Sequence, residues 1–233
     1  MIKSYKKQGA SFKIAPRSVW IEKVLNEECF KSEDLEVRFN LMVEWGHKAG
    51  LRAHEICALS LDQIPSRETI EQAIIKKENI FIELTVTKGK KQSMIPVSGI
   101  LLKKTLDYIE FERNQLIKKF KTEARLNRKT YIPPAQVFIS STTGQALHRR
   151  TLSNQLRARW QQALKNGKLT KNEYVWVHGL RLRHRFATDI LKEFSKSKNI
   201  RDPREVTKTL TRHRHSSTLD IYTSSIHLED MND

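Results

Sequence analysis

The apolar positions of this 233-residue chain repeat with a helical period over most of its length. Side chains three and four residues apart share one face of a helix, so such a repeat predicts an amphipathic helix. Gly50 is a plausible helix stop, and Ser98 is a candidate N-cap. The pattern predicts helices over 15–25, 33–50, 53–64 (passing into an extended piece), 98–120, 151–167 and 177–194, with short helical pieces near the end.

The period changes to two between residues 79 and 97. Ile80, Ile82, Leu84 and Val86 alternate with more polar positions, which is typical of a strand, and 93–97 is its expected partner across the turn KGKK. We expect loops or linkers at 121–136 and 195–203, and a small hairpin at 137–147. The predicted fold is therefore mainly α with a small antiparallel β-sheet (α+β).

The first residues are polar and basic. We expect residues 1–16 to form a basic arm or linker remnant and 17–233 to form one domain. No apolar run reaches the roughly 18 residues that a membrane helix needs. Cys29 and Cys57 have no metal-ligand spacing and are typical of a reducing compartment, so we expect a cytoplasmic protein without a metal or other cofactor.

The formal net charge of the chain gives the strongest indication of its partner. Lysine and arginine number 43 against 26 acidic residues, which gives a formal net charge of +17. Such an excess favours a polyanionic partner, because each neutralised phosphate releases condensed counterions. A basic solvated surface is the alternative, and we favour nucleic acid because the excess is large for this length.

Several positions could place cations around a phosphate. Arg52 follows the Gly50 break at the start of a helix, and Glu55 lies one turn further on, where it can brace the guanidinium or the backbone. Lys88 lies at the tip of the predicted hairpin, where Lys90 and Lys91 compete for the same role.

The stretch VHGLRLRHRFATDIL contains two further pairs of basic residues. His178 and Arg181 are three residues apart and share a helix face, and Arg183 and His184 form a second pair. The apolar residues that flank them predict partial burial. A buried guanidinium needs an anion, and phosphate is a natural bidentate partner.

Near the end of the chain, HRHSSTLDIY places His213 nine residues ahead of Tyr222, with His215 between them. A tyrosine can act as the nucleophile that forms a covalent phospho-enzyme and so conserves the phosphodiester energy. The arginines, lysine and histidines could neutralise the pentavalent phosphorane and protonate its leaving oxygen. No acidic metal cluster is evident in the sequence.

In this order, the motifs GLRAHEI, a hairpin lysine, HGLR…HRFAT and LTRHRHSSTLDIY resemble the catalytic domain of the tyrosine recombinases, the lambda-integrase family, over about residues 17–226. The resemblance implies a metal-independent enzyme that cuts and rejoins DNA through a 3′-phosphotyrosine, formed by Tyr222. It implies that two arginines hold the non-bridging oxygens, that Lys88 protonates the leaving 5′-oxygen, and that His178 assists proton transfer. His213 would hydrogen-bond the phosphate, because the family spacing to the tyrosine selects it over His215.

The second catalytic arginine has two candidates. Counting forward from His178 selects Arg181, whereas counting back from the FAT sequence selects Arg183; we favour Arg181 because of its His-x-x-Arg spacing. By the same resemblance we expect DNA contacts from the positions outside the catalytic set: Lys90, Lys91, Arg185, Arg212 and His215.

Two departures from the family pattern are visible. Arg212 stands where relatives usually carry glycine, which could alter that turn, and only 51 residues precede Arg52, too few for the usual core-binding domain. We expect double-stranded DNA as partner, assembly of tetramers on DNA as in the family, a nucleoid-associated location, and a role in a mobile element. The alternatives are a catalytically impaired DNA-binding remnant, a type IB topoisomerase and a basic RNA-binding protein.

Overall fold

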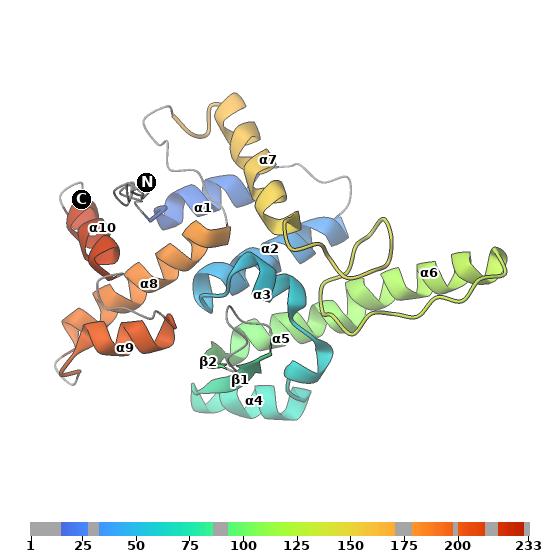
Figure 1. Cartoon of the computed structure of the whole chain (residues 1–233), viewed down its shortest axis with the longest axis horizontal. Coiled ribbons are helices and arrows are strands. Elements are labelled where there is room, and N and C mark those ends of the chain that lie inside the picture. The colour runs from blue at the N-terminus through green and yellow to red at the C-terminus, as the bar shows by residue number, and fades with distance from the viewer. Residues whose placement is uncertain are drawn as a thin grey trace, which may run out of the picture.

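The computed structural model describes residues 15–27, 33–85, 93–170, 179–197, 200–212 and 219–230 (Figure 1). Its helices are α1 (Ser18–Leu25), α2 (Glu33–Lys48), α3 (Ala53–Ala58), α4 (Arg67–Lys76), α5 (Gly99–Tyr108), α6 (Asn114–Leu126), α7 (Thr151–Lys165), α8 (Gly179–Lys196), α9 (Pro203–Leu210) and α10 (Asp220–Asp230). Strands β1 (Asn79–Leu84) and β2 (Ser93–Ser98) form a two-stranded sheet. The predicted fold class, mainly helical with a small antiparallel sheet, is confirmed.

Helix α2 is the centre of the core. Its Phe39, Met42, Val43 and Trp45 are fully buried, and it packs against α3, α5, α7 and α8. The Trp45 indole donates to Thr105 Oγ1 on α5 at 3.0 Å, which satisfies the one polar atom of this side chain. Burial of α2 on several sides explains why its apolar stripe is broad. No helix in the described ranges has the length and apolar character needed to span a membrane.

The sheet follows the predicted alternation. Strands β1 and β2 pair antiparallel with Ile82 opposite Ile95, and these two residues are buried together with Leu84 and Val97. Ser98 ends β2 and caps α5, where its hydroxyl accepts from the Leu101 backbone N–H at 3.3 Å. The Ser98 N-cap and the strands over 79–84 and 93–97 are therefore confirmed, whereas Val86 and the predicted turn lie outside the described residues.

The structure departs from the sequence expectation after residue 108. The predicted long helix is α5, a short π-helical segment (Ile109–Arg113) and α6, and α6 continues to Leu126 through the first part of the predicted loop 121–136. Figure 1 shows α6 projecting away from the rest of the molecule. The expected loop was wrong for 121–126, because Lys, Glu, Ala, Arg and Leu are good helix formers even where nothing covers them.

Two further elements differ from expectation. The predicted hairpin at 137–147 contains a single bridge between Ile139 and Ala146 around the turn at Gly144. Helix α4 lies in a stretch for which no element was predicted, although Ser66 caps it by accepting from the Thr69 N–H at 3.3 Å. Ile75 is 80% exposed on α4, so apolar residues on more than one side blur its periodicity.

The C-terminal helices gather around α8. Helices α9 and α10 both pack against it, as Figure 1 shows at the left of the molecule. Ala187 and Leu191 of α8 form a small apolar cluster with Leu219, Tyr222 and Ile226. This cluster packs α10 against α8 and places the Tyr222 ring against that of His184 on α8.

Candidate active site

The turn after α2 presents a backbone carbonyl to a group of arginines. Gly50 has φ +67°, and a Cβ there would lie 2.4 Å from Phe186 Cδ1, so glycine is required both for conformation and for space. Its carbonyl oxygen accepts from Arg183 Nη1 at 2.7 Å and from Arg212 Nη2 at 3.5 Å. The predicted stop at Gly50 is confirmed, and the turn brings α2, α8 and the end of α9 together.

Arg52 lies at the start of α3 and is tied to Glu55. Its backbone N–H donates to Glu55 Oε2 at 2.9 Å, and its Nη1 donates to Oε1 at 2.9 Å. The Glu55 side chain is fully buried, whereas that of Arg52 is 24% exposed. Glu55 was predicted to brace the guanidinium or the backbone, and it contacts both, while Arg52 keeps part of its surface exposed.

Arg212 reaches the same carboxylate from the other end of the chain. Its Nη2 lies 2.8 Å from Glu55 Oε2 and its Nη1 lies 3.2 Å from Oε1, which is a bidentate pair. Burial alone would raise the pKa of Glu55, but the hydrogen bonds and charge of Arg212, together with those of Arg52, hold it below its usual range. Glu55 is therefore an anion shared by two arginines.

Arg183 completes the cluster from α8. The residue is 1% exposed, and its Nε and Nη2 have no hydrogen-bond partner among the described residues. Burial, and then the like charges of Arg52 and Arg212, lower the pKa of Arg183 to about 9, so it is still a cation at neutral pH. Positive charge in this cluster exceeds the negative charge of Glu55.

Tyr222 lies beside these arginines. Its side chain is 2% exposed, and its ring meets the His184 ring edge to face with centroids 5.2 Å apart. Burial raises the pKa of Tyr222 to about 12, although the charges of Arg183 and Arg52 oppose this rise. The phenol therefore sits within the field of two guanidinium groups that come from distant parts of the sequence.

The structure places the two candidate arginines of α8 differently. Residues two apart on a helix point about 200° away from each other, so Arg181 and Arg183 face different surroundings. Arg183 faces Arg52, Arg212 and Tyr222. Arg181 is half-buried, and burial lowers its pKa. The geometry thus favours Arg183, which the sequence left as the alternative, over Arg181.

Several other predicted residues can be placed only in part. Arg185 has a side chain 5% exposed that is paired with Asp189, so it would have to leave this pair to reach DNA. Arg212 is 12% exposed and bound to Glu55 rather than open to solvent. The remaining predicted residues lie outside the described ranges: Lys88, Lys90, Lys91, His178, His213 and His215.

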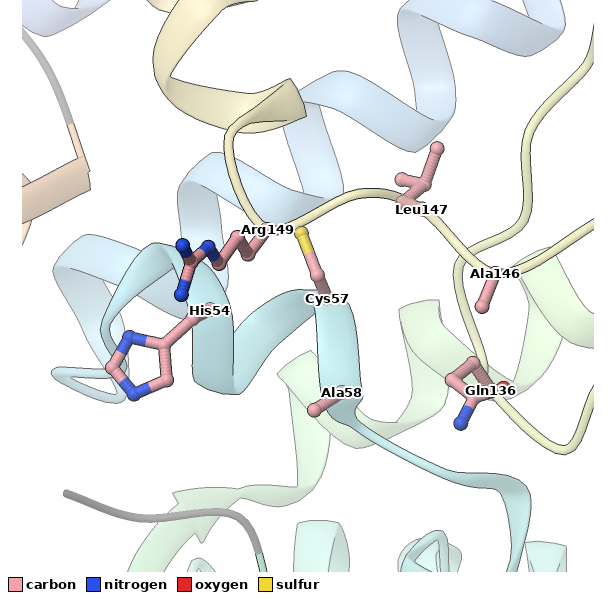
Figure 2. Close-up of a pocket in the computed structure, with 7 residues that line it drawn as sticks. All are labelled: His54, Cys57, Ala58, Gln136, Ala146, Leu147 and Arg149. Atoms are coloured by element: carbon pink, nitrogen blue, oxygen red, sulfur yellow. The ribbon is translucent and has the colours of Figure 1, made fainter.

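A hollow of about 530 Å³ opens next to α3 (Figure 2). His54 and Cys57 of α3 line one side, and Gln136 and Leu147 lie on the segment that faces them. Arg149 extends towards His54 in Figure 2. Burial, and the positive charges of Arg52, Arg149 and Arg212, lower the pKa of His54. The sequence motifs did not single out this hollow, because Arg149 is far from α3 along the chain.

The described residues contain no group of three or more His, Cys, Asp or Glu side chains arranged to hold a metal ion. The arrangement instead offers fixed cations. Three guanidinium groups (Arg52, Arg183 and Arg212) surround one carboxylate, and a phenol lies next to them. Such a site can bind an anion, which would accept hydrogen bonds from the buried Arg183 nitrogens that have no partner among the described residues. It can also hold that anion next to the phenol, a potential nucleophile.

The fold is similar to those of solved recombinases. It matches the XerH site-specific recombinase bound to difH substrate (TM-score 0.55, 18% identity, 91% of this chain and 51% of that chain). It matches the XerA recombinase (0.57, 16%, 95% and 65%) and a lambda integrase dimer bound to a COC′ core site (0.52, 12%, 95% and 63%). The chain thus spans between half and two thirds of their length, and these low identities show the fold alone.

A search of curated proteins finds no match. The sequence does match the model of the phage integrase family over residues 21–228, which include all four members of the cluster and Tyr222. The match extends over most of the chain and agrees with the resemblance that the motifs indicated. This protein therefore belongs to the phage integrase family, the tyrosine recombinases.

Proposed function

We propose that this chain is the catalytic part of a site-specific DNA recombinase that cuts and rejoins DNA through a 3′-phosphotyrosine. The observation that carries this proposal is the meeting of Arg52, Arg183 and Arg212 beside Tyr222. None of the three segments that carry these arginines would indicate a reaction by itself. Their convergence on one phenol supports attack on a phosphodiester.

The charge of the cluster suits a phosphodiester. Three guanidinium cations and the Glu55 carboxylate leave a net charge of +2 in a largely buried place. A phosphodiester carries one negative charge, and a second develops on its non-bridging oxygens as the phosphorane forms. Fixed donors in a region of low dielectric stabilise that developing charge more than the ground state, which accelerates the reaction.

In the proposed first step, the Tyr222 oxygen forms a bond to phosphorus while the bond from phosphorus to the 5′-oxygen breaks. Arg52 and Arg183 would hold the non-bridging oxygens, with Arg183 taking the place that the sequence first gave to Arg181. The tyrosine proton leaves to a base, for which family resemblance proposes His178, and Lys88 would protonate the 5′-oxygen. Attack of a 5′-hydroxyl on the phosphotyrosine reverses these steps and rejoins the strand.

Burial of Tyr222 sets a requirement on this mechanism. A phenol whose pKa is about 12 keeps its proton at neutral pH, and a side chain 2% exposed does not meet a DNA phosphate without movement. Tyr222 must therefore lose its contact with His184 before attack. If it does not move, the chain is the second candidate, a DNA-binding protein without turnover.

Double-stranded DNA is the proposed partner. The formal net charge of +17 favours a polyanion, and solved relatives with this fold include complexes with DNA substrates. His213 is proposed to hydrogen-bond the phosphate, and Lys90, Lys91, Arg185 and His215 stay predicted DNA contacts. Assembly of several copies on DNA, a nucleoid location and a role in a mobile element are proposed from the family resemblance.

The test is capture of a covalent adduct. The full chain is incubated with a library of nicked duplexes of random core sequence, in which loss of the short cleaved fragment traps the intermediate. A denaturing gel then detects protein joined to DNA, and sequencing of the trapped DNA gives the target. Wild type should form the adduct and Tyr222→Phe should not, because phenylalanine lacks the attacking oxygen.

The outcomes separate the candidates. An adduct that persists in Tyr222→Phe would reject Tyr222 as nucleophile. DNA binding by wild type without any adduct would reject turnover and support the second candidate. Tyr108→Phe is a matched control, since Tyr108 is also buried, at 1% exposure, but contacts Phe138 in the core.

A further inference from the structure

Arg212 has a backbone conformation that its side chain does not favour. Its φ is +53°, in the left-handed region where glycine is preferred. Arg128 has the same conformation, with φ +52°, but it is exposed just beyond the end of α6. A positive φ at an arginine destabilises the folded backbone, so we expect a contact of the Arg212 side chain to offset this cost.

The contact of Arg212 is the bidentate pair with Glu55. A carboxylate offers about four acceptor positions, and Glu55 uses two for Arg52 and two for Arg212. The side chain of Arg212 is 12% exposed and that of Glu55 is fully buried, so solvent competes little with this pair. Glu55 is thus saturated, and loss of Arg212 would leave two acceptor positions of a buried anion unfilled.

The pair also joins two parts of the chain. Glu55 belongs to α3, which begins next to Arg52, whereas Arg212 follows α9 and precedes the helix that carries Tyr222. The same arginine reaches the Gly50 carbonyl, which Arg183 also contacts. The planar Arg212 guanidinium therefore connects the site of Arg52 and Arg183, the proposed phosphate ligands, to the segment that leads to Tyr222.

We infer that Arg212 is a positioning residue: its bond to Glu55 holds the Arg52 guanidinium and the Tyr222 segment in the geometry of attack. This inference rests on the proposed recombinase function and deepens it. It differs from the sequence expectation of a DNA contact, because the guanidinium of Arg212 is occupied by a buried carboxylate.

The experiment uses the full chain and the duplex that wild type selects from the random-core library. Adduct formation is measured in a single turnover with protein at saturating concentration, and DNA affinity is measured separately at several salt concentrations. The variants are Arg212→Gly, which fits the backbone but has no side chain, and Arg212→Lys, which keeps the charge without the fork. Arg128→Gly is the matched control, since it makes the same exchange at the same φ.

A positioning role predicts a change in rate without a change in affinity. Arg212→Gly should lower the saturating rate about ten- to a hundredfold, the range expected when reacting groups are misplaced by about 1 Å. Arg212→Lys should recover only part of this loss, because one ammonium cannot reproduce two parallel bonds. Affinity and its salt dependence should stay as in wild type, and Arg128→Gly should change neither quantity.

A double-mutant cycle tests whether Arg212 acts through Glu55. Glu55→Gln alone should slow the reaction, and adding Arg212→Gly should cost little more, because both changes break the same contact. Fully additive losses would overturn the inference. Circular dichroism and thermal unfolding of each variant show whether a lower reaction rate is caused only by unfolding of the protein.

Three other results would also overturn the inference. An unchanged saturating rate in Arg212→Gly would show that the pair between Arg212 and Glu55 is dispensable. Weaker binding with a salt slope reduced by about one, at an unchanged saturating rate, would show that Arg212 is a phosphate contact. Absence of any adduct with wild type would refute the proposed function itself, and the inference with it.

Discussion

Two buried arginines of this protein have opposite surroundings. Arg159 on α7 is fully buried, yet it pairs with Glu36, donates to the Leu25 carbonyl at 2.5 Å, and lies 4.5 Å from the centre of the Phe39 ring. Arg183 on α8 is also buried, but it lies among Arg52 and Arg212 and has two nitrogens without a partner among the described residues. Arg159 thus has a carboxylate and a carbonyl as partners, whereas Arg183 donates, among the described residues, to the Gly50 carbonyl alone.

This difference distinguishes a structural cation from a functional one. A buried guanidinium with a carboxylate and carbonyl partners satisfies the requirements of the fold alone. One that lies among like charges costs stability, so its presence needs another explanation. In the proposed function, a bound phosphate would supply both the missing negative charge and the missing acceptors.

The largest effect is expected from Arg183→Met. Removal of a fixed donor to the phosphorane should lower the adduct rate about a thousandfold. Stability should fall by no more than ~1 kcal/mol, the worth of its hydrogen bond to Gly50, because an uncompensated charge leaves the core as well. Single-turnover kinetics and thermal unfolding measure the two quantities.

Arg181→Met, the same change two residues earlier, should slow the reaction far less. If Arg181→Met slowed the reaction more than Arg183→Met, Arg181 would again be the favoured catalytic arginine.

Gly50→Ala tests the carbonyl that Arg183 contacts. The new methyl group meets Phe186 at 2.4 Å and strains a residue at φ +67°, so the free energy of unfolding should fall by about 2–4 kcal/mol. Gly167→Ala is the control, because Gly167 has φ +70° with nothing within 4 Å of its Cβ position. It should lose only about 1 kcal/mol. Denaturant unfolding compares the two, and equal losses would show that the contact with Phe186 does not matter.

Arg159→Met should destabilise the fold and spare the chemistry. Loss of its bonds leaves Glu36 without this partner, but the Glu36 side chain is 31% exposed, so the expected cost is about 2 kcal/mol. That corresponds to a fall of about 4–8 °C in the midpoint of thermal unfolding. The adduct rate, measured well below that midpoint, should match wild type. A rate as low as that of Arg183→Met would contradict the distinction between the two arginines.

The smallest effect concerns the pH dependence of stability. The folded protein holds the pKa of Glu55 below its unfolded value of about 4.3, so the carboxylate contributes stability that is fully present above that pH. This contribution is lost as pH falls through the lower, folded pKa. Glu55→Gln should therefore flatten the decline in stability on acidification below about pH 4.3. Urea unfolding across this range measures it, and an unchanged slope would show that Glu55 does not carry the effect.

The sequence predicted the main elements because their patterns are local. Period-two alternation marked the first strand and the turn signal marked its partner, while the Ser98 cap and the Gly50 stop have direct side-chain or backbone reasons. Helix α4 escaped prediction because its apolar residues do not share a single face. The end of α6 escaped prediction because the charged residues of 121–126 were interpreted as a loop, although most of them are good helix formers. Local signals thus indicate where an element starts more reliably than how far it runs.

The candidate site divides in the same way. Arg52, Glu55 and Tyr222 were identified by motif and spacing, and the predicted contact between Glu55 and Arg52 is present. The choice between Arg181 and Arg183 was not available from spacing, since both lie on one helix. Packing of α8 against α2, with Leu182 against Gly46 and Phe186 against Gly50, rotates Arg183 towards Arg52.

The amino-acid order by itself determined the family, the helical period of the fold, the excess of positive charge and the identity of the nucleophile candidate. Only the tertiary structure decided which guanidinium groups meet, that Arg212 binds Glu55 across 157 residues, and that Tyr222 is buried. The physical reason is the distance along the chain over which each kind of interaction acts. Propensity and periodicity act between neighbours along the chain, whereas charge compensation and burial depend on groups that folding brings together from its two ends.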